Sequence, residues 1–434
     1  MDKMADVLGR AGAWCGQNKY LSAIKNAFQN FMPLTIAGAI GVLWCNVLVN
    51  ESTGLGIFFK PIMALEFLNP AFQAVNFCTI SCITVGITLG IAQEIGVWNM
   101  GAEKAGYIPG LVGLAAWLSV TNTSHMVEGA KEAFTGIAGN ELGATGLFTG
   151  MIIGVLSVEL FCFFEKQDAL KIKMPEQVPP GVARAFEVLV PATITLIITA
   201  CIGSACYNLT GLYLNDVIKN GIQGPLGAVG ATIPGVMIIY LVIMLFWLVG
   251  IHGNNMLSAV KEALFTPLAL ENVEKFNKGE KPTNIINMYA LQMWGEFGGS
   301  GVTIGLVIAI MIFGKREDNK AIATLSLVPG LFNINETVTF GIPMVLNPIL
   351  GIPFVFACLV TILVGYVLTV IGFCPVACLT VPWTTPPIVF GFLATGANVM
   401  GAVTQAILIV VSTVIYTPFL ISYEKYQNKQ AAEA

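Results

Sequence analysis

Two side chains stand out because they can share or transfer a proton and because almost nothing ionisable surrounds them. Glu336 is the one charged residue in the stretch 321–423. His252 is the only side chain of the Asp, Glu, Lys, Arg or His type in the stretch 220–260. A carboxylate can act as a general base, and an imidazole titrates near neutral pH. The pair is therefore suited to acid–base chemistry.

The composition places these residues in a membrane. Of 434 residues, 56% are hydrophobic and 11% charged, with a mean hydropathy of +0.78. Soluble domains carry about 25% charged residues, so this chain lacks the charge to cover a water-facing surface. The net charge of −4 gives no basic surface for nucleic acid, and the ten cysteines, mostly in apolar runs, show no zinc-type spacing. We expect an all-α polytopic membrane protein without a metal site or cofactor.

Glu336 lies in LFNINETVTFGIPMV (331–345), a segment that is rich in polar side chains and contains Gly341 and Pro343. An uncompensated carboxylate at the bilayer centre costs about 2.5–3.5 kcal/mol. Backbone amides could satisfy this carboxylate, or it could be protonated and buried. As the only charge in a long neutral stretch, it favours a functional role at the tip of a broken hairpin.

His252 follows a full-length apolar span and precedes Gly253, Asn254 and Asn255, which suit a turn and offer amide donors and acceptors. A lone histidine is most often a satisfied polar residue, but the polar cluster favours function here. His125, in the loop sequence NTSH, lacks such a setting and favours a structural role.

A third cluster, YALQMWGEFGGSG (289–301), holds Gln292, Trp294 and Glu296. Its glycine-rich run matches neither the P-loop nor the dinucleotide pattern, so we expect close packing or a re-entrant tip.

Three tryptophans indicate the kind of ligand. Sugars offer hydroxyls to carboxylate, imidazole and amide groups, and apolar C–H faces to aromatic rings. Trp247, Trp294 and Trp383 lie in or beside the broken segments. A single tryptophan is commonly a residue of the membrane interface. Together with Glu336 and His252, the three favour a sugar site.

The apolar runs predict about ten spans, each needing about 20 largely apolar residues. Full-length candidates are 31–50, 72–93, 144–164, 187–208, 227–251, 345–373 and 399–422, and shorter or broken candidates are 108–120, 299–314 and 376–396. Three further pieces, 253–270, 284–298 and 331–344, are too short or too polar to span. Transporters place their substrate at such broken segments, so the second half of the chain should hold the site.

Charge and amphipathicity suggest the topology. The patterns at 1–30 and 209–222 predict helices in the headgroup layer. Basic residues favour a cytoplasmic N-terminus, 165–186 loop and C-terminal tail. The four lysines and four glutamates of 261–283 suit a water-exposed loop for a soluble partner. We expect residues 1–208 to form a scaffold with the oligomer contact, and 209–434 to form the substrate-binding transport domain.

Two motifs, NINETVTFGIPMVLNP (333–348) and WLVGIHG (247–253), carry a resemblance to a known family. The chain resembles the membrane-embedded IIC component of the bacterial sugar phosphotransferase system, in the lactose, cellobiose and diacetylchitobiose class, with diacetylchitobiose and cellobiose permeases most similar. The resemblance extends over nearly the whole chain. It implies a homodimer in the cytoplasmic membrane, with about ten spans per subunit and two re-entrant hairpins that enclose the sugar. The family's carboxylate falls on Glu336 and its histidine on His252.

The resemblance also implies a reaction. The sugar is carried inward and phosphorylated by a phosphocysteine on a separate soluble IIB protein, which is supplied in turn through IIA. The chain would be an enzyme only as the permease part of a sugar phosphotransferase. Because we expect residues 424–434 to form only a short tail and no IIB domain, no cysteine of this chain is assigned the phosphocysteine role.

The mechanism that we expect gives each site residue a role. Glu336 accepts a hydrogen bond from a sugar hydroxyl, the one on C6, and then acts as general base. His252 binds the same ring or steadies developing negative charge. Further contacts to the sugar come from Asn254, Asn333, Asn335 and Gln292, and a stacking face from Trp383. The competing hypothesis is a secondary symporter driven by H⁺ or Na⁺, with Glu336 as the coupling carboxylate and His252 as a proton relay.

Overall fold

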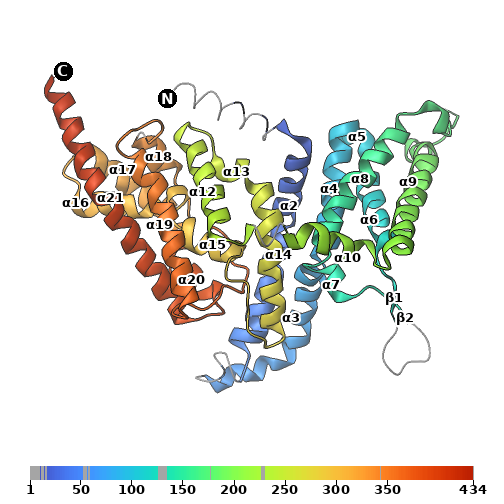
Figure 1. Ribbon diagram of the computed structural model, residues 1–434, viewed down its shortest axis with the longest axis horizontal. Helices are drawn as coiled ribbons and strands as arrows, with labels where there is room; N and C mark the ends of the chain where they lie inside the picture. Colours follow the sequence, from blue (N-terminus) through green and yellow to red (C-terminus); the bar gives the residue numbers. More distant parts are fainter. Residues whose placement is uncertain are drawn as a thin grey trace. The chain divides into compact units, whose positions relative to one another are not determined.

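The computed structural model describes residues 17–51, 56, 59–125, 134–175, 177–225, 230–342 and 344–433, together with Arg10 and Trp14. Packing divides the chain into two compact units. From residue 17 onward, the first unit comprises Gln17–Gly38 and Ala74–Ala228, and the second comprises Ala39–Gln73 and Val229–Ala434. Both units are built from helices (Figure 1), so the predicted helical class is confirmed.

The first unit also contains the one sheet of the described residues, which the sequence did not predict. Its elements are η4 (Phe77–Ser81), α4 (Ile83–Met100), α5 (Ala102–Ala105), α6 (Ile108–Val120), β1 (Ser124–His125), β2 (Phe134–Thr135), α7 (Gly139–Leu142), α8 (Leu147–Glu165), η5 (Asp168–Leu170), α9 (Pro180–Thr210), α10 (Leu214–Ile218) and η6 (Lys219–Gln223). Strands β1 and β2 pair antiparallel, with Ser124 opposite Thr135. The pattern predicted at 209–222 is helical, as α10 and η6.

Close approach between helices holds the first unit together. Helices α4, α6 and α8 pack against one another (Figure 1). A methyl group added at Gly113 of α6 would overlap the Cβ of Ala92 on α4. Trp117 is buried with Val120 and Ile153 in a core between α6 and α8. Small residues at helix contacts are typical of membrane proteins, where van der Waals packing drives association.

Helix α2 (Lys19–Leu43) corrects one expectation. The sequence predicted a surface helix up to residue 30 and a separate span from 31, but α2 runs through both without a break. The polar groups of its first turns bind protein side chains: Lys19 pairs with Glu159 at 2.6 Å, and Asn26 donates to Glu94 at 2.9 Å. The residues of the predicted surface helix before 17 lie outside the described residues, except Arg10 and Trp14.

The second unit contains the predicted broken segments. Its elements are η1 (Trp44–Leu48), η3 (Lys60–Leu68), α12 (Ile233–Leu248), α13 (Gly253–Met256), α14 (Ser258–Asn277), α15 (Met288–Gly295), η7 (Ser300–Val302), α16 (Ile304–Phe313), α17 (Glu317–Leu331), α18 (Glu336–Gly341), α19 (Gly351–Val370), α20 (Val389–Ala394) and α21 (Val399–Glu433). Helix α3 (Asn69–Asn76), like α2, includes residues of both units.

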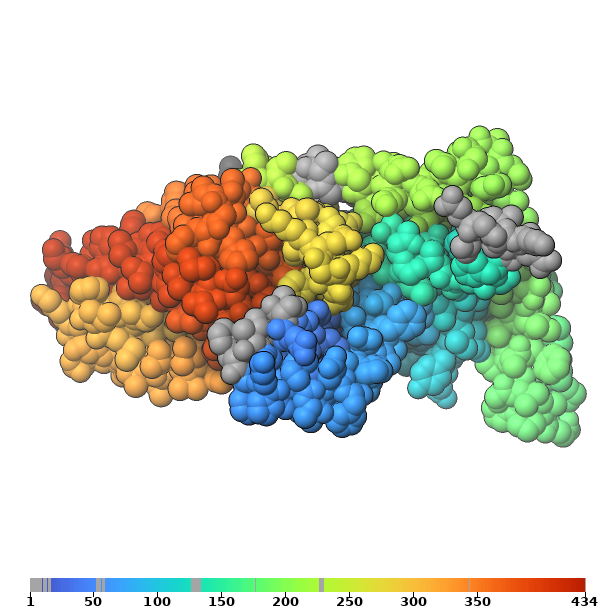
Figure 2. Space-filling view, turned by 90° about the horizontal axis from the view of Figure 1, so that it is seen from below, coloured from blue at the N-terminus to red at the C-terminus, as the bar shows by residue number. Residues whose placement is uncertain are grey.

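Helix α14 replaces most of the loop that the sequence predicted at 261–283, so that prediction is wrong. The many charged residues indicated an exposed loop, but one face of the helix is buried, and Lys261, Phe265 and Val273 recur on it at helical spacing. Asn272, also on this face, donates to the carbonyl of Ala377 at 3.0 Å. Figure 2 shows the yellow α14 against the orange segments of the same unit.

The helices are long and apolar enough for a multi-pass membrane protein. Among the described residues, five helices meet the length and composition of a span, and counting two bent pairs would raise the number to seven. The five are Lys19–Leu48, Leu147–Glu165, Pro180–Thr210, Gly351–Val370 and Val399–Glu433. The bent pairs are Lys60–Ser81 with Ile83–Met100, at 43°, and Met288–Val302 with Ile304–Phe313, at 59°. Helices α6 and α12 are apolar but shorter, and the total of about ten spans stays a prediction.

The nine described cysteines are all free. The expectation of small buried hydrophobes holds for Cys162, Cys358, Cys374 and Cys378, whereas Cys78 and Cys201 are exposed on the isolated chain.

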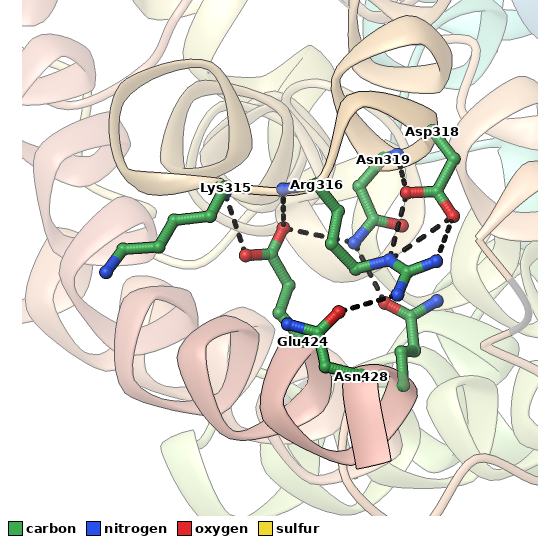
Figure 3. Close-up of polar contacts among 7 residues, drawn as sticks. Lys315, Arg316, Asp318, Asn319, Glu424 and Asn428 are labelled. Carbon is green, nitrogen blue, oxygen red and sulfur yellow. Dashed lines mark hydrogen bonds and ion pairs between the residues drawn. The ribbon is translucent and has the colours of Figure 1, made fainter. Parts of the chain in front are cut away.

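A network of polar contacts connects α21 to the turn between α16 and α17 (Figure 3). The buried carboxylate of Glu424 accepts from the backbone amide of Lys315 at 2.8 Å and from the side chain of Asn319 at 3.1 Å. Arg316 donates to Asn428 at 2.7 Å, and its hydrogen bonds hold the pKa of Asp318 below the ordinary value. These contacts explain why α21 continues past residue 422, where the sequence predicted the span to end.

Candidate functional site

The structure brings His252 and Glu336 together across 84 positions of sequence. Atom Nε2 of His252 lies 3.8 Å from Oε1 of Glu336, and the two side chains are 38% and 47% exposed. Within the described part of the chain, the carboxylate of Glu336 accepts no hydrogen bond. Both groups are therefore accessible to a ligand and sit close enough to share one.

The end of α12 positions His252. The backbone turns at Gly250, with φ of +81°, and the amide of Ile251 returns to the carbonyl of Phe246 at 2.9 Å. His252 then caps α13, where Nδ1 accepts from the backbone amide of Asn255 at 3.3 Å. Because Nδ1 is an acceptor, the neutral ring carries its proton on Nε2, the atom that faces Glu336.

The indole of Trp247 packs against the imidazole of His252. Its ring is buried and lies 4.4 Å from the His252 ring, centroid to centroid, and 6.5 Å from that of Phe354. Trp247 thus restricts the rotation of His252.

Two asparagines fix the segment that carries Glu336. Asn333 has φ of +63°, a conformation that asparagine tolerates. Its Oδ1 accepts from the amide of Gly298 at 2.6 Å, and its Nδ2 donates to the carbonyls of Trp383 and Thr385, the latter at 3.1 Å. Asn335 is buried, donates to the carbonyl of Ser300 at 2.8 Å and directly precedes Glu336, the first residue of α18.

A glycine loop joins the two halves of the site. Gly298, Gly299 and Gly301 have φ of +68°, +86° and +75°, the region that favours glycine. Between them, the buried Ser300 binds both sides: its Oγ accepts from Asn254 at 2.8 Å and its carbonyl accepts from Asn335. The expected use of these glycines, close packing, agrees with Gly299, where a Cβ would lie 2.6 Å from that of Asn335.

Three predicted residues have different surroundings. Trp383 is 44% exposed, and its carbonyl binds Asn333. Gln292 lies on α15, half-buried, and its side chain makes no hydrogen bond to the described residues. Trp294 is 1% exposed and packs so closely on α19 that a Cβ at Gly365 would overlap its indole, so this conformation offers no ring face to a ligand.

The sequence analysis assigned no role in the site to three residues of this network. Ser300 was part of a glycine-rich run, Lys261 was placed in a loop, and Glu296 was noted without a partner. In the structure, Lys261 forms an ion pair with Glu296 and also donates a hydrogen bond to Asn254. The helical spacing of Lys261 and Phe265 was the signal that could have revealed the buried position of Lys261.

Comparison with known proteins identifies the family. Residues 25–358 match the model of the phosphotransferase system EIIC family. The chain belongs to this family. The resemblance stated from the two motifs is confirmed.

Two relatives and one solved structure align with nearly the whole length of this EIIC chain. It is 33% identical to the oligo-beta-mannoside-specific EIIC component of Bacillus subtilis, over 98% of this chain and 94% of that protein. It is 29% identical to the cellobiose-specific EIIC component of Lactococcus lactis, over 98% of both. The crystal structure of the transporter ChbC, the IIC component of an N,N'-diacetylchitobiose-specific phosphotransferase system, matches with a TM-score of 0.88 and 29% identity, covering 97% of both chains.

Proposed function

We propose that this EIIC chain carries a β-linked disaccharide across the cytoplasmic membrane and presents one of its hydroxyls for phosphorylation. The contact between His252 and Glu336 carries the proposal. Atom Nε2, which carries the proton of the neutral ring, lies 3.8 Å from the acceptor Oε1, so one hydroxyl oxygen can lie about 2.8 Å from each of these two atoms. That oxygen would accept from His252 and donate to Glu336.

The same arrangement suits phosphoryl transfer. As the sugar hydroxyl oxygen, on C6 in our proposal, bonds to phosphorus, its proton passes to Glu336, and the bond from phosphorus to the cysteine sulfur of a soluble IIB protein breaks. His252 steadies the negative charge that develops on the oxygen. IIA would recharge the IIB protein. Once phosphorylated, the sugar is charged and fits a site of neutral amides and aromatic rings poorly, so release is inward.

The remaining site residues would hold the sugar rings. Trp383 offers the exposed aromatic face, and the amide of Gln292 makes no hydrogen bond to the residues that the structure describes. Asn254, Asn333 and Asn335 are occupied by protein contacts. We therefore give these asparagines a mainly positioning role. Trp247 acts through His252, and Trp294 would reach the sugar only after a change of conformation.

The predicted boundary at residue 208 does not coincide with the two compact units, since Ala39–Gln73 lies in the second unit and 209–225 lies in the first. All the proposed site residues belong to the second unit. We propose that the sequence after 208 forms the transport part, with two re-entrant hairpins around the sugar, and that residues 1–208 supply the scaffold and the contact of a homodimer. Both termini would face the cytoplasm, as the basic residues near them suggest.

The ion-coupled symporter is not favoured, because the matching family is that of phosphotransferase permeases. The substrate class rests on relatives named for cellobiose, oligo-beta-mannosides and N,N'-diacetylchitobiose, whose sugars share β-glycosidic bonds.

Ligand-induced thermal stabilisation of the purified chain tests the substrate class. Cellobiose and maltose provide the matched comparison, since both are glucose disaccharides that differ in the β or α configuration of the bond. A ligand at about 100 times its Kd stabilises a protein by about 2.7 kcal/mol. We expect cellobiose, N,N'-diacetylchitobiose or a β-mannobiose to raise the melting temperature by several degrees and maltose to leave it unchanged. Equal stabilisation by maltose would contradict the proposed class.

A further inference from the structure

Among the described residues, Lys261 is the only lysine or arginine that is buried; its side chain is 7% exposed. It lies in the first turn of α14, close to the turn that holds His252. A buried cation is costly unless a counter-charge and hydrogen bonds compensate it, and inside a membrane protein such groups are commonly functional. Its contacts indicate what it does.

Lys261 connects elements from across the second unit. Its ammonium pairs with the carboxylate of Glu296 and lies 5.5 Å from the ring centroid of Tyr240. The hydroxyl of Tyr240, on α12, donates to the same carboxylate at 2.7 Å. Lys261 also donates to Oδ1 of Asn254, on α13, at 3.2 Å.

The ammonium sets the direction of the hydrogen bonds that follow. An ammonium can only donate, so the amide of Asn254 must turn its oxygen toward Lys261. The nitrogen of that amide then points to Ser300, and Nδ2 donates to the serine Oγ at 2.8 Å. The backbone carbonyl of Ser300 in turn accepts from Nδ2 of Asn335, the residue that directly precedes Glu336. A directed chain thus runs from Lys261 to the glutamate of the proposed site.

We propose that Lys261 is a positioning residue for the sugar site. By fixing the orientation of the Asn254 amide, it fastens the turn of His252 to Ser300 and so sets the separation between His252 and Glu336. Glu296 is its counter-ion, and neither residue touches the sugar. The inference rests on the proposed function, because it assigns Lys261 a role in the binding of sugar by that pair.

The test separates positioning from stability. Changing Lys261→Met or Glu296→Gln alone leaves a buried charge unpaired and is expected to destabilise the chain. The double variant Lys261→Met/Glu296→Gln removes both charges and keeps the side-chain volumes, so its melting temperature should return close to that of the wild type. Its affinity for cellobiose or N,N'-diacetylchitobiose, measured by calorimetry on the full chain, should still be about tenfold weaker.

A second variant keeps the inference testable if the double variant does not fold. Ser300→Ala removes the acceptor of Asn254 and leaves the ion pair intact. We expect a similar loss of affinity, and no further loss when Ser300→Ala is added to the double variant, because both changes break one chain of contacts.

Wild-type affinity in a folded double variant would show that the ion pair serves stability alone and would overturn the inference. Wild-type affinity in Ser300→Ala would overturn it as well. Failure of the wild-type chain itself to bind either sugar would contradict the proposed function, and this result is seen before any variant is made.

Discussion

The variant Glu336→Gln is expected to lose sugar phosphorylation by at least about 100-fold while its fold is kept. General-base catalysis contributes about 10²–10⁴ in rate, and the neutral amide of glutamine cannot take up the hydroxyl proton. The fold should tolerate the change, because the carboxylate is 47% exposed and accepts no hydrogen bond within the described part of the chain. The rate is measured with phosphoenolpyruvate and the soluble phosphotransferase proteins, and the fold by the melting temperature.

Glu317→Gln is the matched control for this experiment. Glu317 lies in the same unit, its side chain is 87% exposed, and its ion pair with Lys320 spans 3.1 Å on the surface. Such surface pairs contribute little to stability. The control should phosphorylate sugar at the wild-type rate. A wild-type rate in Glu336→Gln would remove Glu336 from the role of base.

The second large effect is expected from Gly299→Ala. An alanine at φ of +86° would destabilise the folded state by about 1–2 kcal/mol, because a side chain disfavours this left-handed backbone conformation. Its Cβ would lie 2.6 Å from the Cβ of Asn335, so one of the two segments must move. Because Asn335 directly precedes Glu336, the carboxylate would shift relative to His252. We expect sugar phosphorylation to fall more than tenfold, together with the melting temperature.

Gly211→Ala separates backbone strain from damage to the site. Gly211 ends α9 with φ of +71°, and a Cβ there would meet nothing within 4 Å. The alanine carries the same kind of backbone cost in the first unit, far along the chain from the site. This variant should melt at a lower temperature and phosphorylate sugar normally per folded molecule. Equal losses of activity in both variants would argue that strain alone explains the effect.

The scarcity of charge made Glu336 and His252 predictable from the sequence. In a chain with few ionisable residues, an isolated carboxylate within a broken segment has few structural explanations. The contact between them was not predictable from spacing, since it depends on how α12, η7 and α18 pack. The glycine loop that joins them was visible as a pattern, but its role depends on the bonds of Ser300.

Lys261 and Trp294 show where sequence patterns misled. Lys261 lies in a segment with three other lysines and four glutamates, whose charges favoured a loop and concealed the buried face of α14. Trp294 lies beside Glu296 and the glycine loop, yet its indole points into the core against α19. Side-chain direction around a helix decides both cases, and a short helix such as α15 gives too few turns for its buried face to be predicted.

The helix boundaries followed the apolar pattern where spans were regular. The predicted 108–120 coincides with α6, and 144–164 lies close to α8 (Leu147–Glu165). The start of α2 and the end of α21 were missed, because the apolar pattern does not extend over polar residues that other side chains bind within the protein: Asn26 of α2 donates to Glu94, and Glu424 of α21 accepts from Asn319.

Proteoliposomes supplied with a labelled β-linked disaccharide test the central claim most directly. One set of vesicles receives phosphoenolpyruvate and the soluble phosphotransferase proteins, and the other receives only a proton or sodium gradient. Our account predicts that labelled phosphosugar forms in the first set and that no free sugar accumulates in the second. Accumulation of free sugar driven by the gradient alone, without phosphosugar in the first set, would contradict it.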